Sequence, residues 1–325
     1  MQPFEYVNSA NTESAISQYS ATSQFLAGGT SLVDLMKLHV QVPNRLVDVS
    51  TLPLKSIVDQ GDRIEVGALV NNNEMALHPL IKNNFPFVSE ALLSGASVQL
   101  RNLATTGGNI LQKTRCVYFR DLHAKCNKRN PGSGCDALEG YNRMNAILGG
   151  SSGCIAVHPS DFAVSLMAAQ AVIKTQGPRG MRETEIEKFL IPPSSNPQIE
   201  TILEPGELIV AVSLPKLPWL KKSTYVKIRD RSSYAFALSS AAVAMELDGK
   251  IVKQVRIAMG GISAIPFRAH SAEQILLGKS LTPEKMSEAA KKMTENAQPR
   301  THNAFKVVLG QQTLIRALQE VENRS

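Results

Sequence analysis

The chain has 325 residues, of which 43% are hydrophobic and 19% are charged, which is typical of a soluble protein of more than one domain. Its longest apolar runs fall short of the roughly 20 residues that cross a bilayer, so we expect no membrane span. The net charge is +7, but the Lys and Arg residues are scattered and no nucleic-acid-binding signature is present, so we expect no nucleic-acid partner.

The N-terminal third alternates between strand and helix patterns. Residues 23–52 predict a strand, a glycine turn, a helix of about two turns and a second strand. RIEVGALV, at 63–70, predicts a further strand. Residues 71–97 predict helical segments that are broken at Pro79 and Pro86.

The middle of the chain changes character at residues 113–153. No helical or strand period of apolar residues is visible there, and the segment instead contains basic residues and an NPGSG sequence. A long irregular insertion in a compact domain is usually functional or disordered. After it, residues 154–175 predict a strand, a turn and an apolar helix, and residues 206–215 predict a strand that ends at a proline.

A domain boundary is predicted near residues 214–223, where two prolines interrupt the pattern. Beyond it, two strand-like runs joined by an Asp-Gly pair at 248–249 predict a β-hairpin. Three helices are then expected, at residues 271–278, 282–297 and 303–321. Thr282 followed by Pro283 is a typical helix start.

Two glycine pairs occur between apolar segments, Gly28-Gly29 in AGGTSL and Gly107-Gly108 in ATTGGNI. Taken alone, each pair is more often a simple tight turn. Such a turn can also direct backbone N–H groups toward a phosphate, and the neighbouring hydroxyl and amide groups suit phosphate oxygens. Neither pair has Rossmann spacing and the chain contains no P-loop, so the familiar nucleotide folds are disfavoured.

All four cysteines fall in one window, with the spacing C-x9-C-x8-C-x18-C. Zinc ligands usually come in closer pairs, and a chain with a full core needs no disulfides. An iron–sulfur cluster takes four thiolates, and a long loop can supply them. The pattern favours such a cluster, with zinc and disulfides as the alternatives. The residues are Cys116, Cys126, Cys135 and Cys154.

Five segments in order carry a family resemblance: AGGTSLVDLMK, LRNLATTGGNI, HPSDFAVSLMAA, PGELIVAVSLP and YVKIRDRSSYAFALSSAAVAM. They resemble the flavin-binding subunit of the molybdenum hydroxylases, the xanthine dehydrogenase and aldehyde oxidoreductase family, and most of all the version in bacterial three-subunit aldehyde oxidoreductases. The resemblance covers nearly the whole chain.

The resemblance implies an α+β fold. A two-lobed FAD-binding domain of the PCMH or vanillyl-alcohol-oxidase type would be followed by a smaller α/β C-terminal domain with a three-stranded sheet and helices. Lobe 1 would span residues 1–55 and lobe 2 residues 56–217, with the cysteine-bearing insertion at 113–155. The C-terminal domain would span residues 218–325.

The resemblance also implies an FAD site, in which the two glycine turns wrap the diphosphate. Asp161 would accept from a ribityl or ribose hydroxyl, and as a residue before an apolar run it could equally cap the following helix. The implied cofactor-binding residues are Leu26, Ala27, Gly28, Gly29, Thr30, Ser31, Leu32, Ala104, Thr105, Thr106, Gly107, Gly108, Asn109, Ser160, Asp161, Leu208, Ile209, Lys227 and Tyr234. No residue is expected to be catalytic toward the substrate.

Two of these residues have competing interpretations. Lys227 would lie near the isoalloxazine, where its charge favours the anionic reduced flavin, whereas by itself it is typical of a solvated strand lysine. Tyr234 would lie near the ring face, or else be a half-buried strand aromatic. Leu208 and Ile209 would form an apolar wall.

A subset of the family carries a cysteine-bearing insertion that binds an extra 4Fe–4S cluster, and KCNKRNPGSGC and SGCIAVHPSD resemble that version. The four cysteines would be its ligands. His123 could ligate iron but is expected to be a solvated loop residue, and His158 is expected to pack or hydrogen-bond locally.

The resemblance implies one subunit of a heterotrimeric complex. A large molybdenum subunit would oxidise an aldehyde or heterocycle, a small 2Fe–2S subunit would pass single electrons, and FAD on this chain would deliver them to an external acceptor. A free-standing flavin oxidase and a non-catalytic metal-binding scaffold are the alternatives. The N-terminus lacks signal-peptide features, which predicts a cytoplasmic chain, while export on a partner's signal would place it in the periplasm.

Overall fold

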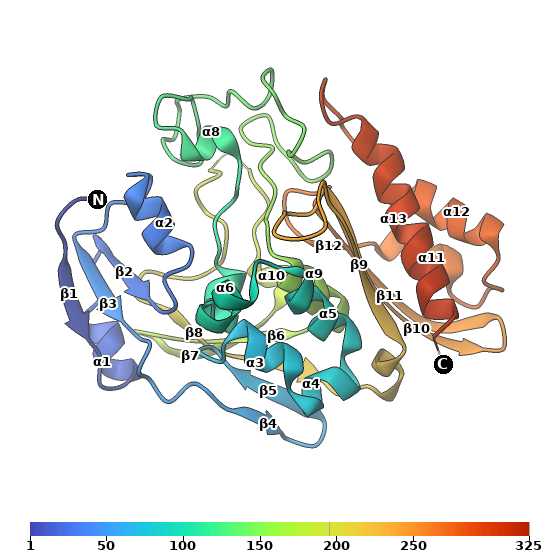
Figure 1. Cartoon of the computed structure of the whole chain (residues 1–325), viewed down its shortest axis with the longest axis horizontal. Coiled ribbons are helices and arrows are strands. Elements are labelled where there is room, and N and C mark those ends of the chain that lie inside the picture. Colours follow the sequence, from blue (N-terminus) through green and yellow to red (C-terminus); the bar gives the residue numbers. More distant parts are fainter. Residues whose placement is uncertain (195, 325) are drawn as a thin grey trace.

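The computed structural model describes residues 1–194 and 196–324, and these residues form three β-sheets with helices packed on them (Figure 1). The first sheet has the order β1-β3-β2, with all neighbours parallel. Its strands are β1 (Glu5–Asn8), β2 (Ser23–Leu26) and β3 (Arg45–Asp48). Helices α1 (Thr12–Ser17) and α2 (Leu32–Lys37) connect them. The predicted strand–helix–strand opening is confirmed by β2, α2 and β3.

The second sheet has five antiparallel strands in the order β4-β5-β8-β6-β7. They are β4 (Ile57–Asp59), β5 (Arg63–Gly67), β6 (Val172–Gly177), β7 (Gly180–Glu185) and β8 (Leu208–Pro215). Strand β8 is central and buried along nearly its whole length, which explains why all its residues except Ser213 are apolar.

Short helices follow β5 along the chain: α3 (Asn72–Leu77), α4 (Pro79–Asn84), α5 (Pro86–Ser94), α6 (Val98–Leu103) and α7 (Thr106–Ile110). The two prolines break the pattern where predicted, and each occupies the first position of a new helix. Proline is suited to that position because its missing N–H would have no helical partner. Phe85 and Phe87 are fully buried in the main core.

Helix α9 (Asp161–Ala169) lies between the second sheet and the third, and every residue after Asp161 is buried. Its apolar sequence therefore reflects burial on all sides. The strand predicted just before it, near 154–157, is wrong. Apart from an isolated bridge at Cys154, this segment is irregular, because its backbone groups bond to other loops; the carbonyl of Ile155, for example, accepts from the N–H of Ala146 at 2.8 Å.

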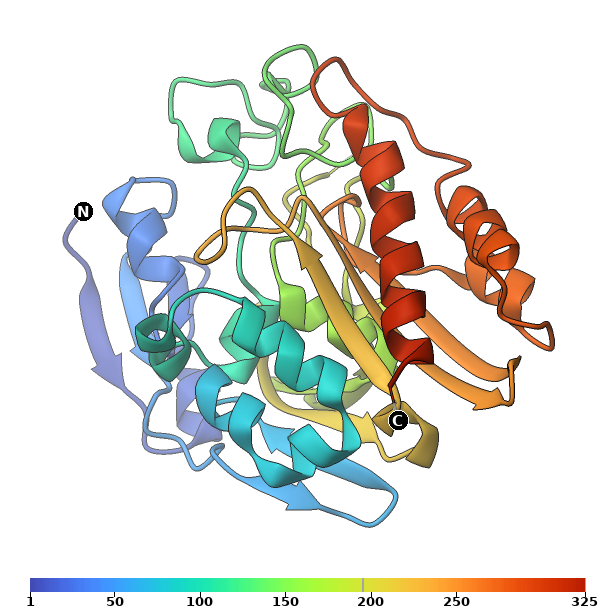
Figure 2. The ribbon, with the colours of Figure 1, turned by 45° about the vertical axis from the view of Figure 1, so that its right-hand side comes forward.

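The third sheet belongs to the C-terminal part of the chain and has the order β12-β11-β10-β9. Its strands are β9 (Ser223–Ile228), β10 (Ser239–Asp248), β11 (Ile251–Gly260) and β12 (Phe267–Arg268). Helices α11 (His270–Leu276) and α13 (Phe305–Glu322) pack on it, and α12 (Pro283–Met293) packs on these two helices (Figure 2). The predicted hairpin and helices are confirmed. The expected three strands are corrected to four, because the two-residue β12 is too short to leave a periodic signal.

The insertion contains one short helix, α8 (Val117–Arg120), and otherwise turns within the described residues. It lies at the top of Figure 1 between the first sheet and the C-terminal helices. Arg115 and Arg120 bind Asp34 of α2 at 3.3 and 2.8 Å, and His302 donates its N–H to Asn142 at 3.0 Å. The insertion is thus attached on both sides. Among the residues described, no helix has both the length and the apolar character needed to cross a membrane.

Gly260→Ala tests how closely α9 packs against the third sheet. A Cβ at Gly260 would overlap the Val164 side chain of α9 and lie 2.8 Å from Ser240 Oγ. Because Val164 is stiff and buried, we expect the free energy of unfolding to fall by about 1–3 kcal/mol. Urea denaturation measures it. Gly95→Ala is the control, since its Cβ would meet atoms at 3.4–3.9 Å, and its effect should stay within about 0.5 kcal/mol.

Candidate functional site

The two glycine turns meet through their backbones. The first turn joins β2 to α2, and the second forms the start of α7 after its N-cap, Thr105. A Cβ on Gly28 would overlap the carbonyl group of Leu103, which directly precedes the second turn. Gly29 has a φ of +69°, a conformation that favours glycine. The first turn therefore needs glycine at 28 for contact and at 29 for backbone conformation.

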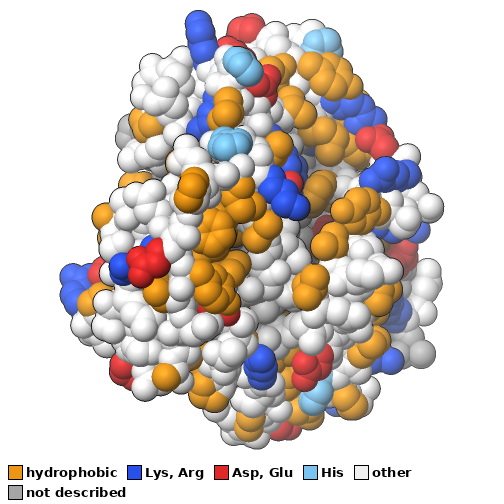
Figure 3. Space-filling view, turned by 60° about the vertical axis from the view of Figure 1, so that its left-hand side comes forward, with side chains coloured by type: hydrophobic (Ala, Val, Ile, Leu, Met, Phe, Trp, Pro, Cys, Tyr) orange, Lys and Arg blue, Asp and Glu red, His pale blue; other side chains and the backbone are white. Residues whose placement is uncertain are grey.

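A cavity of about 470 Å³ opens beside this contact, between the first and second sheets. Both turns line it, and Leu208 and Ile209 at the start of β8 form part of its apolar wall. The loop at 203–207 also lines it, although no sequence motif had singled it out. In Figure 3, which brings this side of the molecule forward, hydrophobic side chains gather around a central hollow with Lys and Arg at its border.

The hydroxyl groups around the turns differ in what they bind. Ser31 Oγ is buried and has no hydrogen-bond partner among the described residues, although Ser31 stands at the N-cap of α2. Thr105 Oγ1 accepts from the N–H of Gly108 at 3.3 Å, and Thr106 Oγ1 donates to the carbonyl of Val70 at 3.0 Å. A buried unpartnered hydroxyl is costly, so Ser31 is suited to a ligand oxygen. Thr105 and Thr106 use their hydroxyls in the fold.

The second turn is also tied to the start of α9. Asn109 Oδ1 accepts from Ser160 Oγ at 2.6 Å, and Ser160 Oγ in turn accepts from the N–H of Ala163 at 2.9 Å. Ser160 is therefore the N-cap of α9, and the prediction that Asp161 caps this helix is wrong. Asp161 occupies the first helical position instead.

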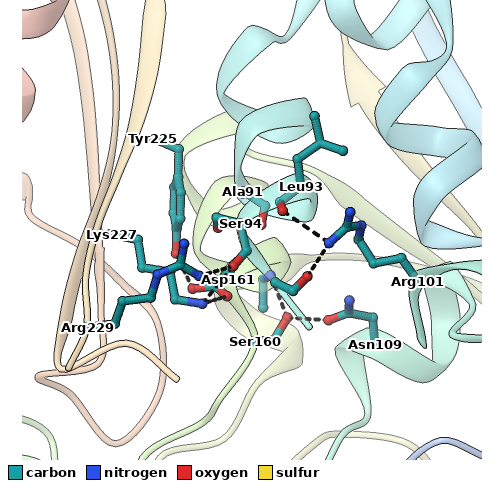
Figure 4. Close-up of polar contacts among 12 residues, drawn as sticks. Ala91, Leu93, Ser94, Arg101, Asn109, Ser160, Asp161, Tyr225, Lys227 and Arg229 are labelled. Atoms are coloured by element: carbon teal, nitrogen blue, oxygen red, sulfur yellow. Dashed lines mark hydrogen bonds and ion pairs between the residues drawn. The ribbon is translucent and has the colours of Figure 1, made fainter. Parts of the chain in front are cut away.

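Asp161 receives two side chains from β9, as Figure 4 shows. Lys227 Nζ lies 2.7 Å from Asp161 Oδ2, and Tyr225 donates its hydroxyl to Asp161 Oδ1 at 2.7 Å. Lys227 also donates to the carbonyl of Ser94 at 3.1 Å. Its side chain is only 4% exposed, so the interpretation as a solvated strand lysine is wrong. Burial and the Asp161 charge raise the pKa of Tyr225 well above its usual value, which keeps its hydroxyl protonated as a donor.

A second cavity of about 280 Å³ lies between the insertion and the C-terminal part of the chain. Asp161 and Ser160 line it on one side and Cys116 on another. Phe236 and Arg115, which sequence reasoning missed, also line it, with the Arg115 guanidinium 5.1 Å from the centre of the Phe236 ring. Neither residue belongs to a recognisable motif. Only the fold brings these segments together.

Tyr234 lies in the loop between β9 and β10 and not on a strand, so its interpretation as a half-buried strand aromatic is wrong. It is 55% exposed and has a φ of +51°. Its carbonyl accepts from Arg231 Nε at 2.9 Å, which holds the loop in this conformation.

The four cysteines come from separate turns of the insertion. Cys126 and Cys135 pair as an antiparallel bridge, Cys126 and Cys154 are buried, and no disulfide joins the four. Burial raises the pKa of Cys154 to about 11, against the opposing charge of Lys128. Burial is also the main cause that raises the pKa of Cys135, and negative charge on neighbouring thiols raises it further.

Two sulfurs also accept N–H groups. Asn145 Nδ2 lies 3.6 Å from Cys116 Sγ, and the N–H of Ala156 lies 3.5 Å from Cys154 Sγ. Within residues 1–194 and 196–324, no group of three or more His, Cys, Asp or Glu side chains is arranged to hold a metal ion.

The two histidines behave as expected. The His123 side chain is 97% exposed and contacts Asp121. His158 is hydrogen-bonded locally, because Nδ1 accepts from the N–H of Ser160 at 3.4 Å and Nε2 lies 3.0 Å from the carbonyl of Ile110. Burial lowers the pKa of His158, which favours the neutral ring.

Comparison with known proteins places this geometry in a family. Residues 2–217 match the model described as FAD binding domain in molybdopterin dehydrogenase, and residues 224–321 match CO dehydrogenase flavoprotein C-terminal domain. The chain is 43% identical over 323 residues to the aldehyde oxidoreductase FAD-binding subunit PaoB of Escherichia coli (strain K12), with 98% of this chain and 97% of that protein covered. It is 25% identical over 323 residues to the carbon monoxide dehydrogenase medium chain of Hydrogenophaga pseudoflava, with 97% of this chain and 96% of that protein covered.

Solved structures share the fold. A carbon monoxide dehydrogenase from Hydrogenophaga pseudoflava that lacks the Mo-pyranopterin moiety matches with a TM-score of 0.78 at 24% identity, over 99% of this chain and 98% of its own. Quinoline 2-oxidoreductase from Pseudomonas putida 86 matches with a TM-score of 0.77 at 20% identity, over 98% of this chain and 97% of its own. From the two family models and the identity to PaoB over nearly the full length, we conclude that this chain belongs to the FAD-binding subunits of the molybdenum hydroxylase family.

Proposed function

We propose that this chain is the FAD- and iron–sulfur-containing electron-transfer subunit of a molybdenum-dependent aldehyde oxidoreductase. It receives electrons from a large molybdenum subunit through a small 2Fe–2S subunit and passes them to an external acceptor. The substrate class follows the 43% identity to PaoB. The observation that carries the proposal is the backbone contact of the two glycine turns beside a cavity that is lined by Ser31, whose buried hydroxyl has no partner among the described residues.

In this proposal the FAD diphosphate occupies the first cavity, between the glycine turns. The flavin ring extends to the second cavity, where an aromatic wall and a few convergent polar groups suit a planar heterocycle. The hydrogen bond from Ser160 to Asn109 supports this assignment, because it ties the turn at the first cavity to the helix start at the second. When bound, FAD supplies the exchange between one-electron and two-electron steps.

Lys227 acts in this site through Asp161. Asp161 lines the second cavity, and Lys227 and Tyr225 each hold one of its carboxylate oxygens from β9. The pair therefore fixes the direction of the carboxylate before a ribityl or ring group arrives. Tyr234, exposed on the neighbouring loop, is available to cover the ring.

We further propose the division into lobe 1 at residues 1–55, lobe 2 at 56–217 and a C-terminal domain at 218–325. Each sheet falls within one of these ranges, and the first cavity lies between the two lobes. The insertion at 113–155 belongs to lobe 2 by sequence but is attached to both neighbours.

We propose that the four cysteines bind one 4Fe–4S cluster. Several features support it: one insertion supplies all four thiols, N–H groups point at two of the sulfurs, and Lys128 brings positive charge close to Cys154. N–H donors and cations both stabilise the negative charge of iron-bound thiolates. Because iron and sulfide alternate at the corners of a 4Fe–4S cube, each thiolate would bind a different iron, so the four ligands need not meet at one ion.

Ser31→Ala tests the FAD site. Loss of a hydrogen bond to a charged phosphate oxygen should cost about 1.5–3 kcal/mol of binding, which is roughly 10- to 150-fold in Kd. Fluorescence titration of the FAD-depleted protein with FAD measures the affinity. Thr106→Val is the matched control, because its hydroxyl binds the Val70 carbonyl, so it should lower stability and leave FAD affinity near wild type. Equal FAD affinities in wild type and Ser31→Ala would contradict the assignment.

Co-expression with the two partner subunits tests the assembly and the cluster. We expect a heterotrimer with one FAD and about four iron and four sulfide per copy of this chain, in addition to the 2Fe–2S iron, because four thiolates hold one cube. Cys154→Ser should lose this iron and retain FAD, since the flavin cavities lie apart from that thiol. If the purified protein contains flavin but no iron, a free-standing flavin oxidase is favoured. If it contains metal but no flavin, a non-catalytic metal-binding scaffold is favoured. Cell fractionation shows whether the complex is located in the cytoplasm or in the periplasm.

A further inference from the structure

Lys306, in the first turn of α13, is a completely buried lysine. Its Nζ donates to the carbonyl oxygens of Asn145 at 3.0 Å and Gly261 at 2.8 Å. Both partners are uncharged. An ammonium group buried against carbonyl dipoles is expensive to maintain, and a methionine would fill similar space without that cost. The position therefore calls for a role beyond packing.

Asn145 connects this ammonium to the cysteine site. Its carbonyl accepts from Lys306 and from Asn303 Nδ2 at 3.4 Å, and its side-chain Nδ2 lies 3.6 Å from Cys116 Sγ. One residue of the insertion thus contacts the buried cation on one side and a thiol on the other. Asn145 therefore links the C-terminal helix to Cys116.

The local electrostatics favour a negative centre near Lys306. Burial lowers its pKa to about 7, and the positive charge of Arg143 lowers it as well. A negative group close by would raise the pKa of Lys306 again, because an opposite charge stabilises the ammonium form. In a buried, weakly screened region such an interaction reaches farther than it does in water.

We propose that Lys306 is a positioning residue of the cysteine site that makes its cluster easier to reduce. Its ammonium fixes the Asn145 backbone, so that the Asn145 amide points at Cys116, and it places a positive charge behind that sulfur. Reduction adds one electron, supplied by the other centres of the complex, to the cluster, and the nearby cation stabilises the added negative charge. No bond forms or breaks at Lys306. The inference rests on the proposed 4Fe–4S cluster.

The test is a redox titration of the assembled complex, followed by electron paramagnetic resonance. Lys306→Met removes the charge and both hydrogen bonds, whereas Lys306→Gln removes the charge and keeps a donor. We expect both variants to lower the equilibrium constant for one-electron reduction of the cluster about tenfold, which is about 59 mV toward negative potential. Asn303→Ala is the matched control: it removes a neutral contact to the same Asn145 carbonyl and should leave the potential unchanged.

The outcomes separate the two proposals. If the wild-type complex lacks the extra iron, the cluster is refuted and this inference falls with it. If iron is present and the potential of both Lys306 variants equals that of wild type, the inference alone is refuted. An equal shift in Asn303→Ala would also refute it, because the effect would then come from loosening of the insertion. If Lys306→Met fails to fold, Lys306→Gln decides.

Discussion

The site depends on one backbone contact, in which Gly28 packs against the carbonyl group of Leu103. A side chain at position 28 would separate the first turn from the segment that leads into the second. The cavity, the unpartnered Ser31 hydroxyl and the cap at Thr105 all lie around this contact. Because the first turn follows β2 and the second leads into α7, which packs on the second sheet, the same contact sets the spacing between the first two sheets.

The start of α9 connects the second glycine turn to the C-terminal sheet. Ser160 is fixed by Asn109 from the second turn, and Asp161 is fixed by Lys227 and Tyr225 from the C-terminal sheet. A buried ion pair with a further hydrogen bond tolerates little displacement, since removing one partner leaves an uncompensated charge. The two cavities are therefore held in a fixed relation by side chains from α7, the start of α9 and β9.

The insertion is ordered although α8 is its one short helix among the described residues, because other elements bind it. Asp34 of α2 binds it on one side, while Asn303, just before α13, and Lys306, in α13, bind it on the other. Inside it, Arg129 donates to carbonyl groups that have no helix or strand partner, such as those of Tyr118 and Phe119 at 2.7 and 2.8 Å. The arrangement of the cysteines is thus set jointly by α2 and by the start of α13.

Local signals in the sequence determined the glycine turns and the helices that begin at Pro79 and Pro86. They also determined the hairpin that turns at Gly249 and the helix cap at Thr282. Each of these features depends on residues that are only a few positions apart. Contacts between distant residues were decided by the tertiary structure alone. Lys227 has the sequence context of a solvated strand residue and is buried because Asp161, far away in the chain, meets it. The same holds for Lys306, since no local pattern indicates that a carbonyl of the insertion will receive its ammonium. Burial and charge pairing are properties of residues that only folding brings together.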